Sequence, residues 1–129
     1  MALERIQPEG VHEARGYTHV VRAAGSRTAY ISGQVGVAPD GAVQAGLEAQ
    51  AKQVFANLAK CIEAAGAQPA DVAKITIYIV NYTPEKRAAL LEARNALWPA
   101  DPPASTLIGV QALASPDFEI EVEAIAVLP

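Results

Sequence analysis

The chain has 129 residues, of which 51% are apolar and 19% charged, and this composition fits one globular domain over residues 1–129 and excludes a disordered chain. The net charge of −4, without a cluster of Lys and Arg, disfavours nucleic acid as a partner. The single cysteine, Cys61, rules out an internal disulfide and fits a reducing compartment. Because the first residues lack a signal-peptide pattern and no apolar run could span a bilayer, we expect a cytoplasmic protein with no membrane partner.

The first half of the chain predicts two strands and a helix. Residues 20–23 and 28–32 favour β-structure, and Gly25-Ser26-Arg27 between them is typical of a turn, so we expect a β-hairpin. Glycines and a proline over residues 33–41 indicate a loop. Residues 47–65 carry apolar side chains at three- and four-residue steps, which predicts a helix that Gly66 terminates.

The second half predicts three further strands and a second helix. Residues 74–80 alternate as a strand does, and Thr83-Pro84-Glu85 has the capping hydroxyl, proline and acid of a helix start. Residues 105–111 and 118–128 are the last strands. The order β-β-α-β-α-β-β predicts the α/β class, specifically an α+β two-layer sandwich whose helices cover one face of the sheet.

The other face of that sheet is also rich in apolar residues. In the last strand, Ile125 and Val127 are on one face, and the apolar residues with which they alternate are on the other. In residues 74–80, Tyr78 and Val80 are on the face away from the three isoleucines. A sheet face of this kind left in water is a large apolar patch, and such patches mark interfaces. The pattern therefore predicts an oligomer without giving the number of subunits.

Few side chains are candidates for chemistry. His12 and His19 have no partners for a zinc site, so we expect surface or hinge histidines and no metal. Cys61 is expected to be a small core residue. Glu119, Glu121 and Glu123 alternate along the last strand; they are either solvated edge charges or the polar lining of a cleft, where apolar neighbours would raise a carboxyl pKa.

Several segments together resemble the Rid family, also called YjgF or L-PSP. The resemblance covers nearly the whole chain in the family's order. It is carried by Gly16-Tyr17-Thr18-His19-Val20-Val21, Ile31-Ser32-Gly33-Gln34-Val35, residues 50–66 and 71–74, Pro103-Ala104-Ser105-Thr106-Leu107-Ile108-Gly109-Val110 and Ile120-Glu121-Val122-Glu123-Ala124-Ile125-Ala126-Val127.

The resemblance implies a chorismate-mutase-like subunit in a homotrimer, with a central barrel and a small-molecule cleft at each subunit interface. Members of the family hydrolyse reactive enamines and imines to carbonyl compounds and ammonia, without a cofactor. By resemblance Glu121 would orient the attacking water as the catalytic residue, Tyr17 would close the cleft and Ser32 would line it. Ser105, Thr106 and Leu107 would bind substrate.

The chain departs from the family pattern at the position that matters most for binding. Ser105 stands where the family places an arginine that grips the substrate carboxylate, and Leu107 stands where many members carry cysteine. The asparagine on the family's second helix has no counterpart near residues 89–91. A hydroxyl cannot replace a charge-assisted pair, whose loss weakens binding by about tenfold to a hundredfold. Arg22, Arg87 and Arg94 are candidates to replace it.

Three functions therefore stay open. The first is hydrolysis of small imines, with Glu121 orienting water. The second is a non-catalytic trimer that binds a small metabolite or acts like a chaperone, which the missing arginine favours. The third is an endoribonuclease, which the acidic balance and the lack of a general-base histidine make the least favoured.

Overall fold

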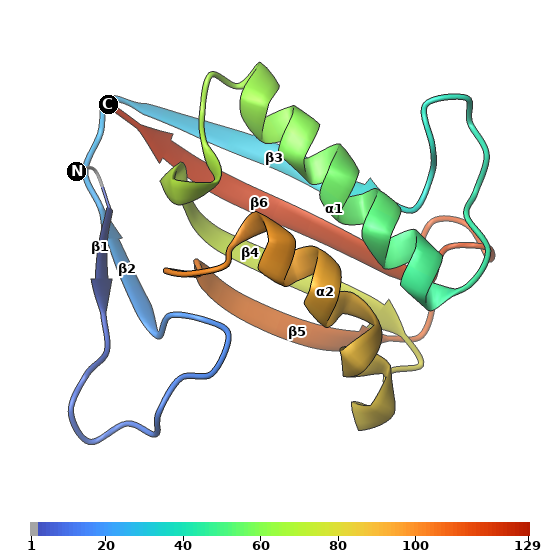
Figure 1. Cartoon of the computed structure of the whole chain (residues 1–129), viewed down its shortest axis with the longest axis horizontal. Coiled ribbons are helices and arrows are strands. Elements are labelled where there is room, and N and C mark those ends of the chain that lie inside the picture. The colour runs from blue at the N-terminus through green and yellow to red at the C-terminus, as the bar shows by residue number, and fades with distance from the viewer. Residues whose placement is uncertain (1–2) are drawn as a thin grey trace.

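The computed structural model describes residues 3–129 and places two helices on one face of a four-stranded sheet (Figure 1). The strands are β3 (Arg27–Val35), β4 (Val72–Val80), β5 (Ala104–Val110) and β6 (Ile120–Leu128), in the order β3-β6-β4-β5. Strands β4 and β5 run parallel, and the other neighbours run antiparallel. The two-layer α/β architecture expected from the sequence is confirmed.

The predicted N-terminal hairpin is wrong. Strand β2 (Val20–Ala23) pairs instead with β1 (Leu3–Ile6), a strand that we did not predict, and the two form a separate small sheet. Strand β3 begins at Arg27, opposite Leu128 of β6. At Gly25 a Cβ atom would overlap the Leu128 carbonyl oxygen, so the chain passes tightly against the end of β6 instead of folding back on β2.

The two helices lie close to their predicted positions. Helix α1 (Leu47–Ala64) is followed by Gly66 at φ 78°, the left-handed conformation that glycine allows at a helix end. The second helix begins later than predicted, because Pro84–Arg87 (η2) forms a 3₁₀ turn before α2 (Ala88–Leu97). Thr83 makes no side-chain cap, so that expectation is wrong. Neither helix within residues 3–129 is both long and apolar enough to cross a membrane.

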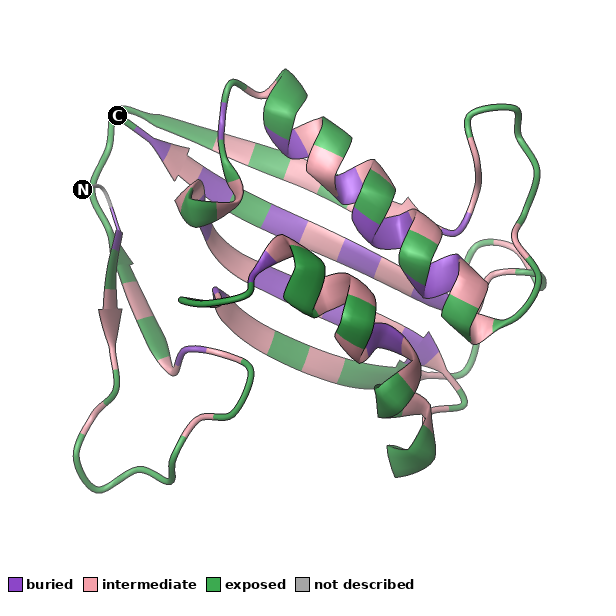
Figure 2. Ribbon diagram, viewed as in Figure 1, coloured by how far each residue is buried: buried purple, intermediate pink, exposed green. Residues whose placement is uncertain are grey.

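The core lies between the helices and the sheet. Buried and partly buried positions alternate along β4 and β6, and α1 has a buried stripe on one side, to which α2 adds the buried Leu90 (Figure 2). A short 3₁₀ turn, η1 (Pro69–Asp71), leads from α1 into β4. The apolar stripe predicted for α1 is confirmed, since Val54, Leu58 and Ile62 are buried there. The largest side chains that they meet from the sheet are Ile75, Ile77, Ile79, Ile120 and Val122.

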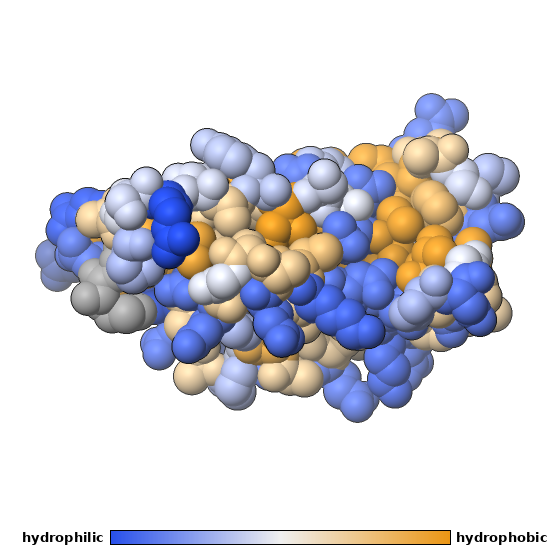
Figure 3. All heavy atoms as spheres, turned by 90° about the horizontal axis from the view of Figure 1, so that it is seen from above, coloured by the Kyte–Doolittle hydropathy of each residue, from blue (hydrophilic) through white to orange (hydrophobic). Residues whose placement is uncertain are grey.

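The opposite face of the sheet, which we call the open face, has no helix over it in the described chain. Its side chains alternate with the buried ones and include three of the large apolar residues that are most exposed. Tyr30 is 79% exposed, Ile108 39% and Ile125 36%, and Tyr30 lies directly opposite Ile125. Seen from above, apolar residues reach the surface in patches between polar ones, the largest of them toward the right of the view (Figure 3).

A buried amide ties α1 to the start of β6. Gln50 is 1% exposed, although the sequence pattern places it among the polar residues of its helix. Its Nε2 donates to the carbonyl oxygens of Gln44 at 3.0 Å and Asp117 at 2.8 Å, and its Oε1 accepts from the Glu119 N–H at 2.8 Å. All the polar atoms of this side chain are therefore engaged with backbone.

Candidate functional site

Glu121 lies on the open face, two residues into β6. It alternates with the buried Ile120 and Val122, so its side chain lies on the side away from the helices. The carboxylate rests on the backbone of Gly33 in the neighbouring strand: a Cβ at Gly33 would lie 2.5 Å from the Glu121 carboxyl carbon and closer still to Oε2. The absent side chain at Gly33 thus creates the place that this carboxylate occupies.

Strand β3 is irregular beneath that carboxylate. The pairing of β3 with β6 shifts register between Ile31 and Gln34, so Ser32 and Gly33 lie at a bulge. The loop predicted for residues 33–41 is therefore wrong at its start, because β3 continues to Val35. Ser32 is exposed, and its carbonyl accepts a hydrogen bond from Gln34 Nε2 at 3.1 Å. Ser32 therefore lies at the irregular point of the strand that pairs with β6, which carries Glu121.

Tyr78 extends the polar group on the open face. It lies opposite Glu121 in the pairing of β4 with β6, and its neighbour on the same strand face, Thr76, lies opposite Glu123. Loss of hydration raises the pKa of Tyr78, and the charge of Glu123, a hydrogen bond to it and the charge of Glu121 raise it further. The phenol is therefore held in its protonated form, as a hydrogen-bond donor beside two carboxylates.

Glu119 is not part of this group. Strand β6 begins at Ile120, and Glu119 precedes it. Its backbone is engaged on both sides, because its N–H donates to Gln50 and its carbonyl accepts from Val80. Two of the three alternating carboxylates, Glu121 and Glu123, thus share the open face.

The three candidate binding residues of β5 lie on both faces of the sheet. Ser105 and Leu107 are opposite the buried Ile75 and Ile77, so they lie on the side of the helices, where Leu107 packs against the core. Thr106 lies on the open face, where its Oγ1 accepts a hydrogen bond from Lys74 Nζ at 2.6 Å. A ligand beside Ser105 would therefore not reach Thr106 on the same strand without passing the edge of the sheet.

Tyr17 is held beside β5 by two histidines. His12 Nε2 lies 2.8 Å from the Tyr17 hydroxyl, and the His19 ring packs edge-on against the Tyr17 ring at 5.2 Å between centroids. Thr18 anchors this loop, since its N–H donates to the Pro103 carbonyl at 3.1 Å and it forms a bridge with Ala104. Sequence reasoning gave the histidines no partner; only their spacing around Tyr17 hinted at this cluster.

The two groups of candidate residues do not meet within one chain. Strand β4 separates β6, which carries Glu121, from β5, which carries Ser105. Neighbouring strands are about 4.8 Å apart, so the two strand axes are about 10 Å apart. Glu121 and Ser105 also lie on opposite faces of the sheet. The described chain therefore carries two partial sites.

The arginines considered as replacements differ in their environment. Arg22 is bound by Glu4, with Nη2 2.7 Å from Oε2 and Nε 3.2 Å from Oε1. Arg94, on α2, lies against the backbone of Gly16. Burial lowers the pKa of Arg94, and the charge of Arg87 lowers it further. Arg22 already has a carboxylate partner, whereas Arg94 and Arg87 are in none of the ion pairs of residues 3–129.

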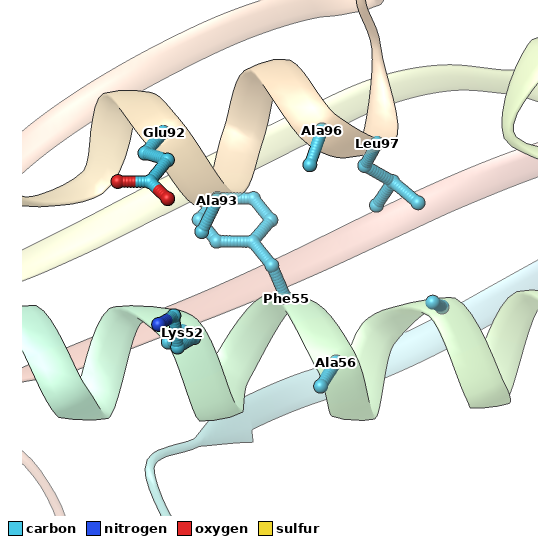
Figure 4. A pocket seen from close by; sticks show the side chains of 8 residues that line it. Lys52, Phe55, Ala56, Glu92, Ala93, Ala96 and Leu97 are labelled. Atoms are coloured by element: carbon cyan, nitrogen blue, oxygen red, sulfur yellow. The ribbon is translucent and has the colours of Figure 1, made fainter.

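A separate hollow lies on the outer side of the helix layer. It is an apolar groove between α1 and α2, with Phe55 projecting between the helices and Lys52 and Glu92 at one end (Figure 4). None of the residues expected to act on a ligand lines it. Within residues 3–129, no group of three or more His, Cys, Asp or Glu side chains is placed to hold a metal ion.

Comparison with known proteins identifies the family. Residues 9–128 match the sequence model described as "Endoribonuclease L-PSP". The chain belongs to this family. The L-PSP family is the same as the Rid family that the sequence resembles, and a solved structure from Yersinia pestis, titled a protein of unknown function of the conserved Rid protein family, YyfB, is 41% identical. The match covers 99% of this chain and 100% of that one, with a TM-score of 0.93.

Curated relatives in the Rid family carry an enzymatic name. A 2-iminobutanoate/2-iminopropanoate deaminase of Salmonella typhimurium is 37% identical over 105 residues, which cover 74% of this chain and 76% of that protein. A protein of the same name from Dermatophagoides farinae is 31% identical over 103 residues, or 78% of each chain. The chain is thus similar to imine deaminases, and the chorismate-mutase-like Rid fold expected for it is confirmed.

Replacing Gly33 with alanine tests how the Glu121 carboxylate is placed. The new methyl group would overlap that carboxylate and force it to move, while the backbone at this position needs no left-handed conformation. We expect Gly33→Ala to fold with a melting temperature near that of wild type and to lose at least tenfold of any Glu121-dependent activity. Thermal denaturation and initial rates measure the two effects. An unchanged rate would show that the carboxylate's position over Gly33 is unimportant.

Proposed function

We propose that this Rid-family protein hydrolyses small reactive imines and enamines to a carbonyl compound and ammonia. The observation that carries the proposal is the fixed position of Glu121, whose carboxylate rests over Gly33 beside Tyr78 on the open face. The family membership and the names of the deaminase relatives support the same reaction class. The reaction needs no cofactor, because water is the only other reactant.

The chemistry requires a carboxylate that accepts a hydrogen bond from water. In the proposed step Glu121 orients a water molecule toward the carbon of the C=N bond, and a new C–O bond forms as the electron pair of the C=N bond moves to nitrogen. Proton transfer to that nitrogen allows ammonia to leave and the carbonyl to form. Tyr78, protonated beside the carboxylates, is in a position to donate a hydrogen bond within the same group.

We further propose that the site is completed by a neighbouring subunit in a homotrimer. The exposed apolar residues of the open face, Tyr30, Ile108 and Ile125, support an interface there. The separation of Glu121 from Ser105 supports a cleft that takes one partial site from each of two chains. Tyr17 would close that cleft and Ser32 would line it, with the small-molecule ligand between subunits. A cytoplasmic location stays a prediction.

A non-catalytic metabolite-binding or chaperone-like trimer is the second candidate, because Ser105 supplies no charge for a substrate carboxylate. Endoribonuclease activity, despite the family's description, is the third; the net charge of −4 disfavours an RNA substrate.

The deciding experiment measures the release of ammonia from 2-iminobutanoate and 2-iminopropanoate generated in situ. Hydrolysis faster than the spontaneous reaction, proportional to protein concentration, is the expected result. A protein that binds 2-oxobutanoate but does not accelerate hydrolysis would favour the binding function. RNA cleavage that persists through ion exchange and is lost on substitution of Glu121 would favour the ribonuclease.

A further inference from the structure

The guanidinium of Arg94 is packed onto the N-terminal loop. A Cβ atom on Gly16 would lie 3.0 Å from Arg94 Cζ and 3.1 Å from Nη1, and closer still to Nη2. Gly16 has φ 78°, a conformation that side chains other than glycine's rarely adopt. Because residue 16 lacks a side chain, the guanidinium can lie directly on its backbone. The Arg94 side chain therefore lies between its own helix, α2, and the N-terminal loop.

Arg94 has no negative partner among residues 3–129. Its Nη2 donates a hydrogen bond to the neutral Asn95 Oδ1 at 3.3 Å, although the residue is partly buried. Burial lowers the pKa of Arg94, as does the positive charge of Arg87. The ion pairs within residues 3–129 are Arg22–Glu4 and Arg15–Glu13. A partly buried guanidinium without a carboxylate partner is a favourable environment for an anion.

Arg94 lies toward the end of β5 that carries Ser105. Thr18 is hydrogen-bonded to Pro103, so Gly16, two residues earlier, lies near the start of β5. Ser105 follows two residues after Pro103, on the sheet face that α2 covers. Arg94 and Ser105 thus approach one end of the strand from the same side.

We propose that Arg94 binds the carboxylate of a small 2-imino or 2-oxo acid, supplying from α2 the contact that Ser105 cannot supply from β5. The planar guanidinium can bind both carboxylate oxygens. The neighbouring Lys86 is engaged elsewhere, because its Nζ donates to the Val80 carbonyl at 3.0 Å. This inference rests on the proposed deaminase function for its substrate, while its test does not require turnover.

The test is calorimetric titration of 2-oxobutanoate into wild type, Arg94→Ala, Arg87→Ala and Arg22→Ala. We expect Arg94→Ala to weaken binding by tenfold to a hundredfold and Arg87→Ala by a smaller factor. Arg22→Ala is the matched control, because it removes the same charge from an arginine that Glu4 already binds, and it should leave affinity unchanged. Equal affinity of Arg94→Ala and wild type, or no binding to wild type, would overturn the proposal.

A second variant separates lost binding from lost folding. We expect Arg94→Ala combined with Ser105→Arg to regain most of the affinity, since the new arginine would reach the same anion from β5. Failure of this folded double variant to bind would overturn the claim that the two positions serve one anchor. Deamination by wild type with unchanged kinetics in Arg94→Ala would leave the proposed function standing without this anchor. Arg94-dependent binding without any deamination would do the reverse.

Discussion

Glu121→Gln should abolish imine hydrolysis while leaving the protein folded and assembled. Glutamine has nearly the same shape and can occupy the same place over Gly33, but it has no charge and is a poorer acceptor for water. General-base assistance contributes roughly 10²–10⁴-fold to a rate, and a loss of that size is the expected result. Initial rates of ammonia release from 2-iminobutanoate measure it, with sedimentation velocity as the check on assembly.

Glu119→Gln provides the matched control for that substitution. Glu119 carries the same carboxylate two residues earlier, but it precedes β6 and its backbone hydrogen bonds do not involve the side chain. Its substitution should leave the rate within about twofold of wild type, since surface changes of this kind have small effects. A Glu121→Gln protein as active as wild type would remove Glu121 from the mechanism.

Ile125→Asp should convert the assembly into a 13.5 kDa monomer. Ile125 lies opposite Tyr30 on the open face, and a charge buried there without a partner costs about 3 kcal/mol or more. A change of that size raises a dissociation constant by more than a hundredfold. Because Ile125 is 36% exposed in the single chain, the subunit itself should stay folded. Sedimentation velocity and thermal denaturation measure the two properties.

Val43→Asp distinguishes the interface from general surface effects. Val43 is 39% exposed, similar to Ile125, but it lies in the loop before α1 and not on the sheet. It should leave the sedimentation coefficient unchanged. Wild-type protein that sediments at 13.5 kDa when dilute and fully folded would contradict both the interface and the cleft built on it.

Much of the fold could be predicted because its signals are local. Alternation in β4 and β6 and the three- and four-residue spacing in α1 predicted these elements within two residues of their bounds. The hairpin failed because a turn and two β-favouring runs do not specify a partner. Strand β1 was missed because four residues are too few to show a period, and only its pairing with β2 makes it a strand.

The site was only partly predictable, for a related reason. Alternation along β6 and along β4 set Glu121 and Tyr78 apart from the buried residues of their own strands. The sequence does not give the strand order, so it could not predict that β4 lies between Glu121 and Ser105. Nor could it select Arg94 among three arginines. That choice depends on the contact with Gly16, 78 residues earlier in the chain, and on the Glu4 side chain that already binds Arg22.

The position of the Glu121 carboxylate depends on the buried amide of Gln50, which takes no part in the proposed reaction. Gln50 accepts a hydrogen bond from the N–H of Glu119, two residues before Glu121, and donates one to the carbonyl of Asp117, just before β6. A carboxylate at position 50 could not donate to two carbonyls, and a methionine would leave three backbone groups unsatisfied. Substitutions at residue 50 would therefore lower the proposed activity indirectly. They would shift the backbone where β6 begins and so change the position of the Glu121 carboxylate.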